Sequence, residues 1–320
     1  MHLNKPILSI CIPTFNRAVY LKKNIESIIC QNEFKNGSVE IVVSDNASND
    51  NTKQLMEFYT KKYNNIFYYR NSSNIGNCNF PYVISKAHGK LRRLCNDNLY
   101  FKPHSLRYMC EIINKYSETQ PYIAWMGQVS EKGIIETDFK GVIRNQSYWL
   151  TYIACFSIWG DECNNIDQDT YGADLLLWQV AKSLEILHKK NNAVLVDKHL
   201  VDVQYVENKN VCYGIYKVFY ENFMMLLNPY VKYGILSSED IDFLEKELLF
   251  KHFLQYGVRY AVQDKTMIYS DTEDLNKLLF IRYRQKKYWK EYERKFNRLV
   301  FCSKLKTKIK TQINRLLGRE

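Results

Sequence analysis

Two short apolar runs, each followed at once by polar residues, most constrain how this chain can fold. The first run covers residues 7–12 and leads into residues 13–17 (PTFNR), and the second covers residues 39–43 and leads into residues 44–52 (SDNASNDNT). Both runs are rich in β-branched residues and lack an alternating polar face, which is typical of strands buried on both faces of a parallel sheet. Ligands of such sheets bind beyond the carboxyl ends of the strands. We therefore expect the two polar segments to line one crevice suited to a nucleotide.

Missing motifs exclude two other nucleotide-binding folds. No Gly-x-Gly-x-x-Gly follows the first strand, as a dinucleotide-binding domain would require. No P-loop occurs either, since Gly89-Lys90 is followed by Leu91. These absences argue against a dehydrogenase and against a P-loop ATPase.

Composition places the chain among globular proteins. Of its 320 residues, 46% are hydrophobic and 14% aromatic, enough to bury a sizeable core. No apolar run reaches the roughly 18 to 20 residues that span a bilayer, and the first residues lead into a strand without a signal-peptide pattern. Nine cysteines without a Cys-x-x-Cys pair indicate reduced thiols. We therefore expect a cytoplasmic protein.

Strands and helices continue to alternate as far as about residue 130. The spacing predicts a helix ending at Tyr63, a strand over residues 66–69 and a helical segment over residues 77–88. A fourth strand, beginning after Gly89, ends in the polar tripeptide Asn96-Asp97-Asn98. This third polar strand end is expected at the same edge of the sheet as the first two.

The strand ends resemble those of family-2 glycosyltransferases, which have the GT-A fold. In that family the opening strand ends in a Pro-Thr-x-Asn-Arg-like segment, as at residues 13–17, and the second in Asp-x-x-Ser-x-Asp-x-Thr, as at residues 45–52. Less common residues for the family stand at four positions, Asn46, Ala47, Asn49 and Asn51. The resemblance covers the first 130 residues well and residues 150–205 loosely. It implies an α/β fold: a Rossmann-like, mainly parallel sheet sandwiched by helices, with an α-helical C-terminal extension.

We expect residues 1–212 to form the GT-A catalytic domain, with a nucleotide-sugar half over residues 1–103 and an acceptor half over residues 104–212. After about Val211 the alternation ends and helical patterning takes over. Residues 213–320 are therefore expected to form a helical C-terminal region that ends in a basic amphipathic helix.

The resemblance implies an inverting glycosyltransferase that moves a hexose from a nucleotide sugar, with uridine diphosphate (UDP) the commonest carrier. The chain is most similar to bacterial enzymes that build surface polysaccharides, such as capsule or O-antigen, on a lipid carrier. By this resemblance Asp45 would accept a hydrogen bond from the uracil ring, and Asp45→Ala should abolish nucleotide binding without disturbing the fold. Arg17 would approach the phosphates. The expected nucleotide-sugar residues are Pro13, Thr14, Phe15, Asn16, Arg17, Asp45, Asn46, Asn74, Arg93, Asn96 and Asp97.

In GT-A enzymes the fourth-strand tip carries an Asp-x-Asp-type motif that holds Mn²⁺ or Mg²⁺ against the donor diphosphate. Here the tripeptide 96–98 offers one carboxylate and two amides. Counting from Gly89 puts Asn98 at the usual ligand position, whereas an Asp-Asp-Asn-x-Tyr alignment puts Asp97 there. We assign the metal to Asp97, the only anion present. The alternative is a turn that caps the following helix.

An inverting transferase also needs a base for the acceptor hydroxyl. We expect this base at Asp174, at the start of a predicted helix, with Asp161 and Asp169 as further candidates upstream. The alternative for Asp174 is a first-turn acid stabilised by the helix dipole. His199, which follows a predicted strand over residues 193–197, is either a late metal ligand or a packing residue.

The net charge of +11 lies entirely in the tail, because residues 282–320 hold fourteen Lys or Arg and three Asp or Glu. Helical spacing gives the tail one apolar stripe, formed by Cys302, Leu305, Ile309, Ile313 and Leu316. Such a helix either lies on an anionic membrane surface or docks on the protein's own core. No nucleic-acid motif accompanies the charge. We expect a cytoplasmic protein held peripherally on the inner face of the bacterial cell membrane, near a lipid-linked saccharide acceptor.

A second class of function stays open. Because two positions of the metal motif hold amides, the chain could be a glycosyltransferase-like binding or scaffold protein that has lost catalysis. A peripheral membrane module that depends mainly on the basic tail is the third reading.

Overall fold

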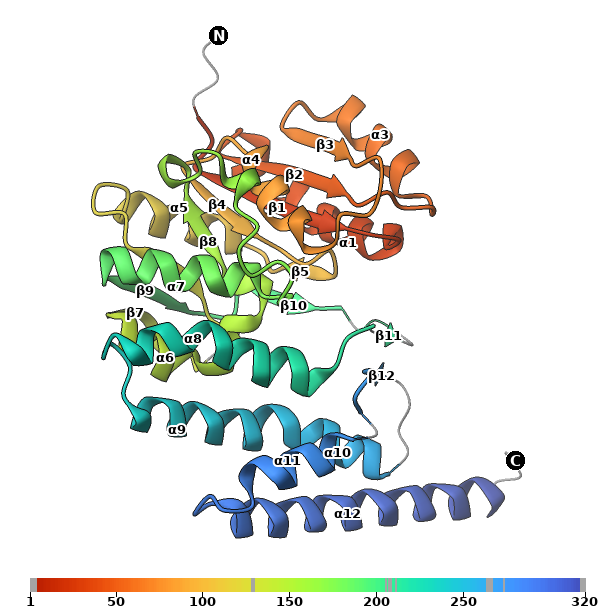
Figure 1. Ribbon diagram of the computed structural model, residues 1–320. Helices are drawn as coiled ribbons and strands as arrows, with labels where there is room; N and C mark the ends of the chain where they lie inside the picture. The colour runs from red at the N-terminus through yellow and green to blue at the C-terminus, as the bar shows by residue number, and fades with distance from the viewer. Residues whose placement is uncertain are drawn as a thin grey trace. The chain divides into compact units, whose positions relative to one another are not determined.

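The computed structural model describes residues 5–127, 130–204, 206, 209–210, 212–262, 267–272 and 274–316. The chain divides into two compact units, Met1–Tyr205 and Val206–Glu320 (Figure 1). The functional boundary expected after residue 212 stays a prediction.

A five-stranded sheet with the strand order β3-β2-β1-β4-β8 forms the centre of the first unit (Figure 1). Its strands are β1 (Leu8–Thr14), β2 (Val39–Asp45), β3 (Ile66–Arg70), β4 (Leu91–Leu94) and β8 (Ser157–Trp159). The first four run parallel and β8 runs antiparallel to β4. The register pairs Thr14 with Asp45 and Asp45 with Arg70, so three strand ends meet at one edge.

Helices pack on both faces of this sheet, as predicted. They are α1 (Ala18–Ile29), α2 (Asn32–Lys35), α3 (Thr52–Lys62), α4 (Asn79–Ser85) and α5 (Ser105–Lys115). Leu8, Ile10 and Ile12 of β1 share one hydrophobic core with side chains of α1, α3 and α5. On the opposite face α4 packs on β1, β2 and β4, where Ser44 Oγ donates to Asn79 Oδ1 at 2.5 Å.

The rest of the first unit contains two smaller sheets and further helical turns. One sheet has the order β6-β9-β7, and β5 pairs with β10 in the other. These strands are β5 (Leu99–Phe101), β6 (Tyr122–Trp125), β7 (Gly133–Thr137), β9 (Ala193–Asp197) and β10 (Val201–Val203). The helical segments are η1 (Gly76–Cys78), α6 (Phe139–Gln146), η2 (Ser147–Thr151), η3 (Ile153–Cys155), η4 (Gly160–Glu162), η5 (Ile166–Gln168) and α7 (Trp178–Lys190).

The second unit is mainly helical, as expected of a C-terminal extension. Its segments are β11 (Lys209–Asn210), η6 (Lys217–Asn222), α8 (Phe223–Lys232), α9 (Ser238–Glu247), η7 (Leu248–Phe253), α10 (Leu254–Ala261), β12 (Met267–Ile268), α11 (Leu275–Tyr283) and α12 (Trp289–Leu316). Ser237 caps α9 through a reciprocal pair of hydrogen bonds with Asp240. Within the described part of the chain, no helix is long and apolar enough to cross a membrane.

The long helix α12 differs in burial along its length. Near its start Tyr292 is 3% exposed, with its ring 5.8 Å from that of Phe250. Farther along, Phe301, Leu305 and Ile309 are 68%, 46% and 46% exposed. The helix therefore docks on its own unit at one end and presents an apolar stripe to solvent beyond it. The side chains of Ile313 and Leu316, also expected in this stripe, lie outside the described residues.

Candidate functional site

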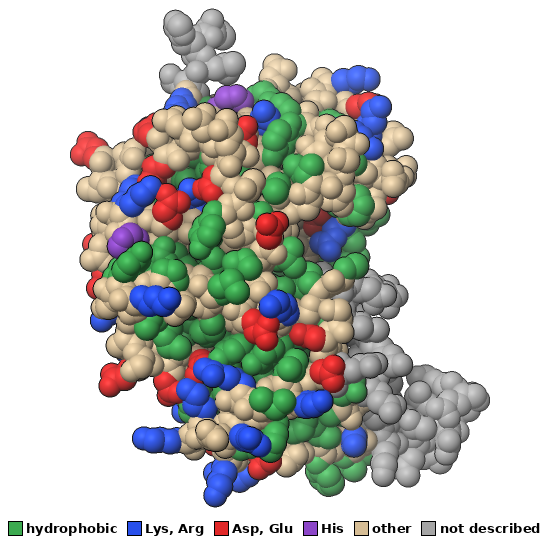
Figure 2. Space-filling model, in the orientation of Figure 1, with side chains coloured by type: hydrophobic (Ala, Val, Ile, Leu, Met, Phe, Trp, Pro, Cys, Tyr) green, Lys and Arg blue, Asp and Glu red, His purple; other side chains and the backbone are tan. Residues whose placement is uncertain are grey.

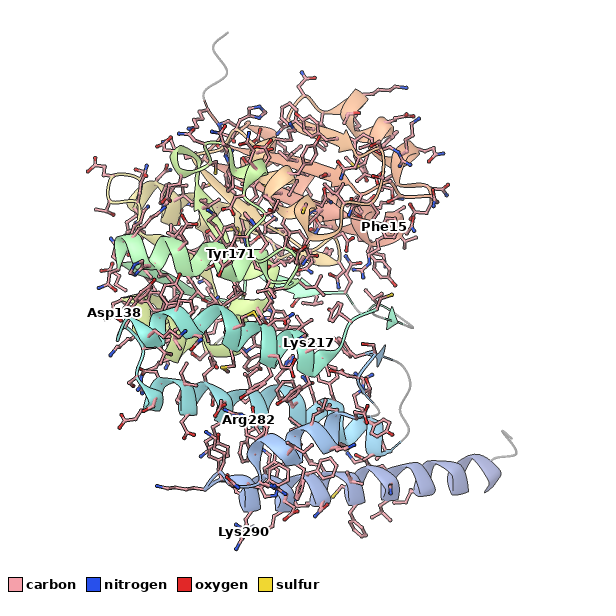
Figure 3. The ribbon with its side chains drawn as sticks, viewed as in Figure 1. Phe15, Asp138, Tyr171, Lys217, Arg282 and Lys290 are labelled. Carbon is pink, nitrogen blue, oxygen red and sulfur yellow. The ribbon has the colours of Figure 1, made fainter. Side chains whose placement is uncertain are left out.

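The segment that joins β1 to α1 carries the first group of expected site residues. Pro13 and Thr14 end the strand, and the chain then turns through residues 15–17 before α1 begins. Phe15 is 41% exposed and points outward from the end of β1 (Figure 3). An exposed aromatic ring at a strand end offers a face on which the flat ring of a nucleotide base can stack.

The ends of β1 and β2 are hydrogen-bonded directly to each other. Asn16 N donates to Ser48 Oγ at 2.8 Å, and Asn49 N donates to Asn16 Oδ1 at 2.7 Å. Asn16 has φ 53°, in the left-handed region that Asn tolerates better than most residues. The two polar segments therefore form a single ledge, which is the arrangement expected from the parallel strands.

Asp50 ties the same ledge to two helices. Its Oδ2 accepts from Ala18 N, the first residue of α1, at 2.9 Å, and its Oδ1 accepts from Thr52 N at 3.0 Å and Thr52 Oγ1 at 2.5 Å. Burial acts to raise the pKa of Asp50, but these hydrogen bonds favour the charged form and bring the pKa below its usual value. Asp50 therefore stabilises the entry into both α1 and α3 as a carboxylate.

Asp45 lies at the centre of the joined strand ends and is fully buried. Its Oδ1 accepts from Ser48 N at 2.7 Å, and its Oδ2 accepts from Tyr68 OH and from Arg70 Nη1, both at 2.7 Å. Burial and the neighbouring carboxylate raise the pKa of Tyr68 to about 12. Because this carboxylate connects β2, β3 and the ledge, we expect Asp45→Ala to destabilise the fold, in place of the sequence-based expectation that the fold stays intact.

Asn46 and Asn74 hold the segment that follows β3. Asn46 Nδ2 donates to Asn74 Oδ1 at 2.7 Å, and Asn46 Oδ1 accepts from Ile75 N at 2.8 Å and from Asn71 Nδ2 at 3.1 Å. Asn74 Oδ1 also accepts from Gly76 N at 2.8 Å. The structure thus brings these two expected site residues together, and each contributes to the shape of the segment.

Asp97, beyond the end of β4, reaches the end of β1. Thr14 Oγ1 donates to Asp97 Oδ2 at 2.9 Å, and Arg17 Nη1 lies 3.1 Å from Asp97 Oδ1. Asp97 is 4% exposed, whereas the Arg17 side chain is 29% exposed. The neighbouring Asn96 accepts through its backbone oxygen from Asn24 Nδ2 at 3.0 Å. The ends of β1, β2 and β4 consequently form one polar site.

Residues 9–147, which contain all three strand ends, match the model of glycosyl transferase family 2. The chain carries a family-2 glycosyltransferase domain. Abequosyltransferase RfbV of Salmonella typhimurium is 44% identical over 85 residues, 26% of this chain and 25% of the relative. A GalNAc(5)-diNAcBac-PP-undecaprenol beta-1,3-glucosyltransferase of Campylobacter jejuni is 44% identical over 68 residues, 21% of each chain. This chain thus spans about a quarter of the length of such relatives.

Solved structures agree in fold over nearly the whole chain. Residues 1–349 of S. aureus TarS align with 93% of this chain and 91% of that one, at 13% identity and a TM-score of 0.54. The mannosyltransferase PcManGT of Pyrobaculum calidifontis, solved with GDP-Man and Mn²⁺, aligns with 99% of this chain and 88% of that one, at 12% identity and a TM-score of 0.51. At these identities the likeness establishes the fold, and the family-2 domain has the GT-A fold predicted for it.

The metal motif of the family-2 domain fits a cation only in part. Among the described residues, no three His, Cys, Asp or Glu side chains are grouped to hold a metal. Both oxygens of Asp97 have partners, and Asn98 Nδ2 donates to Gln204 O at 3.0 Å. Mg²⁺ sites on nucleotides commonly use one or two carboxylates and take further oxygens from the phosphates. The residues present therefore suit a divalent cation only together with a bound diphosphate.

The position of Arg93 contradicts its expected role in binding the nucleotide sugar. The residue is 2% exposed, and its Nε and Nη2 donate to Ala154 O at 3.2 and 3.1 Å. Its guanidinium lies 4.8 Å from the ring centroid of Trp125. Burial lowers the pKa of Arg93. The side chain packs inside the domain because β4 points it there, so Arg93 stabilises the core.

The acidic residues proposed as catalytic base differ in their surroundings. Asp174 is exposed and lies in a turn, because α7 begins at Trp178 instead of at residue 174. Positive φ values of 84° at Gly172 and 58° at Leu176 delay the helix. The other two candidates form ion pairs, Asp161 with Lys5 and Asp169 with Lys182.

Two residues of the site were missed by the sequence reasoning, Tyr68 and Arg70, which hold Asp45 from the end of β3. Ser48, which links both polar segments, lies within the segment expected to line the crevice. Arg70 is the last residue of a strand in the same parallel sheet. Ligands bind beyond the carboxyl ends of parallel strands. This rule, which drew attention to the ends of β1, β2 and β4, also applies to Arg70 at the end of β3. His199, considered as a metal ligand, instead pairs with Asp202 at 2.8 Å.

Proposed function

We propose that this chain is an inverting glycosyltransferase that moves a hexose from a UDP-linked sugar to a growing, lipid-linked bacterial surface polysaccharide. The observation that carries the proposal is the joining of three strand ends of a family-2 domain into one polar site with Phe15 exposed beside it. In an open α/β sheet this edge is where nucleotides bind.

The comparisons support the donor and the acceptor to different degrees. A TarS structure with UDP-GlcNAc aligns at a TM-score of 0.52, which is consistent with a nucleotide-sugar donor. The Campylobacter jejuni relative is named for an undecaprenol-linked acceptor, and the Salmonella typhimurium relative is an abequosyltransferase. We extend the nucleotide-sugar donor and the lipid-linked acceptor to this chain because these relatives are 44% identical to part of it.

In the proposed complex the nucleotide base stacks on Phe15, and the diphosphate lies against Arg17 and Asp97. A divalent cation, Mn²⁺ or Mg²⁺, would be held by Asp97 together with phosphate oxygens and would neutralise charge on the leaving nucleoside diphosphate. Pro13, Asn16 and the buried polar groups shape the ledge. The exposed Asp174 is our candidate for the base that takes the proton of the acceptor hydroxyl.

Phe15→Ala tests the donor site. Stacking of a base on an aromatic side chain contributes about 1 to 3 kcal/mol, so we expect UDP affinity to fall at least fivefold by calorimetry. Phe58→Ala is the matched control, because Phe58 is 58% exposed on α3, away from the ledge. An equal loss of UDP affinity in both variants, or no loss in Phe15→Ala, would contradict the assignment of the nucleotide site to this edge of the sheet.

Transfer is tested with purified protein, UDP-hexoses and short lipid-linked saccharides. An inverting enzyme gives a product whose anomeric configuration is opposite to that of the donor, which NMR of the product resolves. Asp174→Asn should abolish transfer but retain UDP binding. Binding of UDP without any transfer or donor hydrolysis would favour the alternative, a binding or scaffold protein, for which the single carboxylate at residues 96–98 is the supporting observation.

We further propose that α12 attaches the enzyme to the anionic inner face of the cell membrane, close to its acceptor. Lys and Arg side chains gather around the turn between α11 and α12, where Lys290 is labelled in Figure 3 (Figures 2 and 3). Residues 294–316 contain eight basic and no acidic residues. The exposed stripe Phe301, Leu305 and Ile309 would enter the lipid interface, and the charges would bind anionic headgroups.

A further inference from the structure

One cation is already bound to the only carboxylate of the metal motif. Arg17 Nη1 lies 3.1 Å from Asp97 Oδ1, and Thr14 Oγ1 donates to Asp97 Oδ2 at 2.9 Å. Of these partners Thr14 is 3% exposed, whereas the Arg17 side chain is 29% exposed. Arg17 is therefore the partner with access to solvent and with room to move.

The ledge fixes the backbone from which Arg17 reaches Asp97. Its carbonyl accepts from Leu21 N at 3.0 Å, at the start of α1. Its neighbours on either side are held by the β2 loop, Asn16 through Ser48 and Ala18 through Asp50. Only the side chain of Arg17 is left to change position, and a guanidinium tethered in this way is present at high effective concentration.

Arg17 and a metal ion compete for the charge of the same carboxylate. A guanidinium 3.1 Å from Asp97 Oδ1 already neutralises the single negative charge of this side chain, and it would repel a divalent cation bound to the same group. Arginine also binds phosphate strongly, through paired N–H donors. A diphosphate therefore offers Arg17 a better partner and at the same time offers the metal additional oxygens.

We propose that Arg17 occupies the cation position on Asp97 in the nucleotide-free protein, and that a divalent cation gains this carboxylate when a diphosphate draws Arg17 away. This inference rests on the proposed donor site. It makes Arg17 a positioning residue that couples nucleotide binding to metal binding, so that the metal does not bind before the nucleotide. By linkage, the nucleotide and the metal must strengthen each other's binding equally.

The test measures Mn²⁺ binding in the absence of nucleotide, from the electron paramagnetic resonance signal of free Mn²⁺. Arg17→Gln removes the competing cation, so its Mn²⁺ affinity should rise about tenfold or more over the wild type. The double variant that combines Arg17→Gln with Asp97→Asn should not show this rise in Mn²⁺ affinity. Arg107→Gln is the control, because Arg107 forms an exposed pair with Glu111 on α5 and should leave Mn²⁺ affinity unchanged.

The second measurement repeats the titrations with saturating UDP. UDP should raise Mn²⁺ affinity by a larger factor in the wild type than in Arg17→Gln, because part of the wild-type gain comes from releasing Asp97. If Arg17→Gln does not fold, Arg17→Lys replaces it, and a gain of a few-fold is expected because an ammonium lacks the paired donors of a guanidinium. Unchanged Mn²⁺ affinity in a folded Arg17 variant would overturn the inference.

The outcomes separate this inference from the proposed function. Absence of UDP binding by the wild type would reject the donor site, whereas the nucleotide-free Mn²⁺ titration would still decide whether Arg17 competes for Asp97. In the converse outcome, the wild type binds UDP while all folded Arg17 variants bind Mn²⁺ with the same affinity as the wild type. That result would support the donor site and reject the competition between Arg17 and the metal.

Discussion

Asp45→Ala should destabilise the first unit strongly, because this residue combines complete burial with three hydrogen bonds. Its carboxylate accepts from Ser48 N, Tyr68 OH and Arg70 Nη1, each at 2.7 Å. The partners come from three places, the β2 loop and two positions of β3. An alanine at position 45 offers none of them an acceptor.

The expected loss of stability in Asp45→Ala follows from these hydrogen-bond partners. A hydrogen bond to a charged group contributes about 1.5 to 3 kcal/mol, and Ser48 N and Tyr68 OH each lose one. The Arg70 side chain is 34% exposed, so water replaces much of its contact and its share stays below about 1 kcal/mol. Allowing for relaxation around the smaller side chain, we expect Asp45→Ala to lower the free energy of unfolding by about 3 to 5 kcal/mol.

The measurement is denaturant unfolding followed by far-UV circular dichroism, together with UDP calorimetry. Asp138→Ala is the control, because Asp138 caps α6 through one exposed hydrogen bond to Gly141 N and should cost about 1 kcal/mol. Arg70→Gln keeps the other two hydrogen bonds of Asp45 and should cost less than Asp45→Ala. If Asp45→Ala lowers the free energy of unfolding by less than about 1.5 kcal/mol, the view that this carboxylate holds the strand ends together is refuted.

Three further outcomes are expected. Ala47 has φ 65° at a position where glycine is the commonest family residue, so Ala47→Gly should raise the free energy of unfolding by about 0.5 to 1 kcal/mol, and a lower melting temperature would contradict this. Burial lowers the pKa of His252 to about 3. The unfolded chain therefore takes up a proton near pH 6.5 that the folded protein excludes, and stability should fall as the pH drops below 6.5, by up to about 1.4 kcal/mol per pH unit. His252→Phe should reduce this slope in denaturant titrations between pH 7 and 5, and an unchanged slope would assign it to other groups. Deleting the residues after Phe296 should release the protein from anionic vesicles, and attachment of the full chain should weaken as salt shortens the Debye length from about 10 Å at 0.1 M to about 3 Å at 1 M; equal binding to neutral vesicles would reject the electrostatic part.

The sequence was most informative where strand ends carry polar residues. Periodicity and β-branched content predicted the strands that became β1, β2, β3 and β9, because these features reflect burial on both faces of a sheet. The same argument correctly brought residues 13–17, 45–50 and 97 to one edge, since parallel strands place their carboxyl ends together.

Strand periodicity and strand ends did not predict which side chains contact each other. Arg93 was expected among the nucleotide-sugar residues, but which side of β4 it faces depends on packing against Trp125 and Ala154, residues distant in sequence. The start of α7 was misplaced because left-handed residues, among them Leu176, carry no local sequence signal for that conformation. Burial of the Asp45 carboxylate also required knowledge of β3 pairing, which no single motif contains.

Most polar residues of the site form hydrogen bonds with each other. The site therefore contains buried, hydrogen-bonded positions and positions that remain accessible to solvent. Asp45, Asn46 and Asp97 are at most 6% exposed, and each is hydrogen-bonded within the protein. Phe15 and Arg17 retain access to solvent. Substitutions at the buried positions should therefore change stability and nucleotide affinity together, because they alter the shape of the ledge. A substitution at Phe15 should change affinity alone, since removal of an exposed ring leaves the network that positions it unbroken.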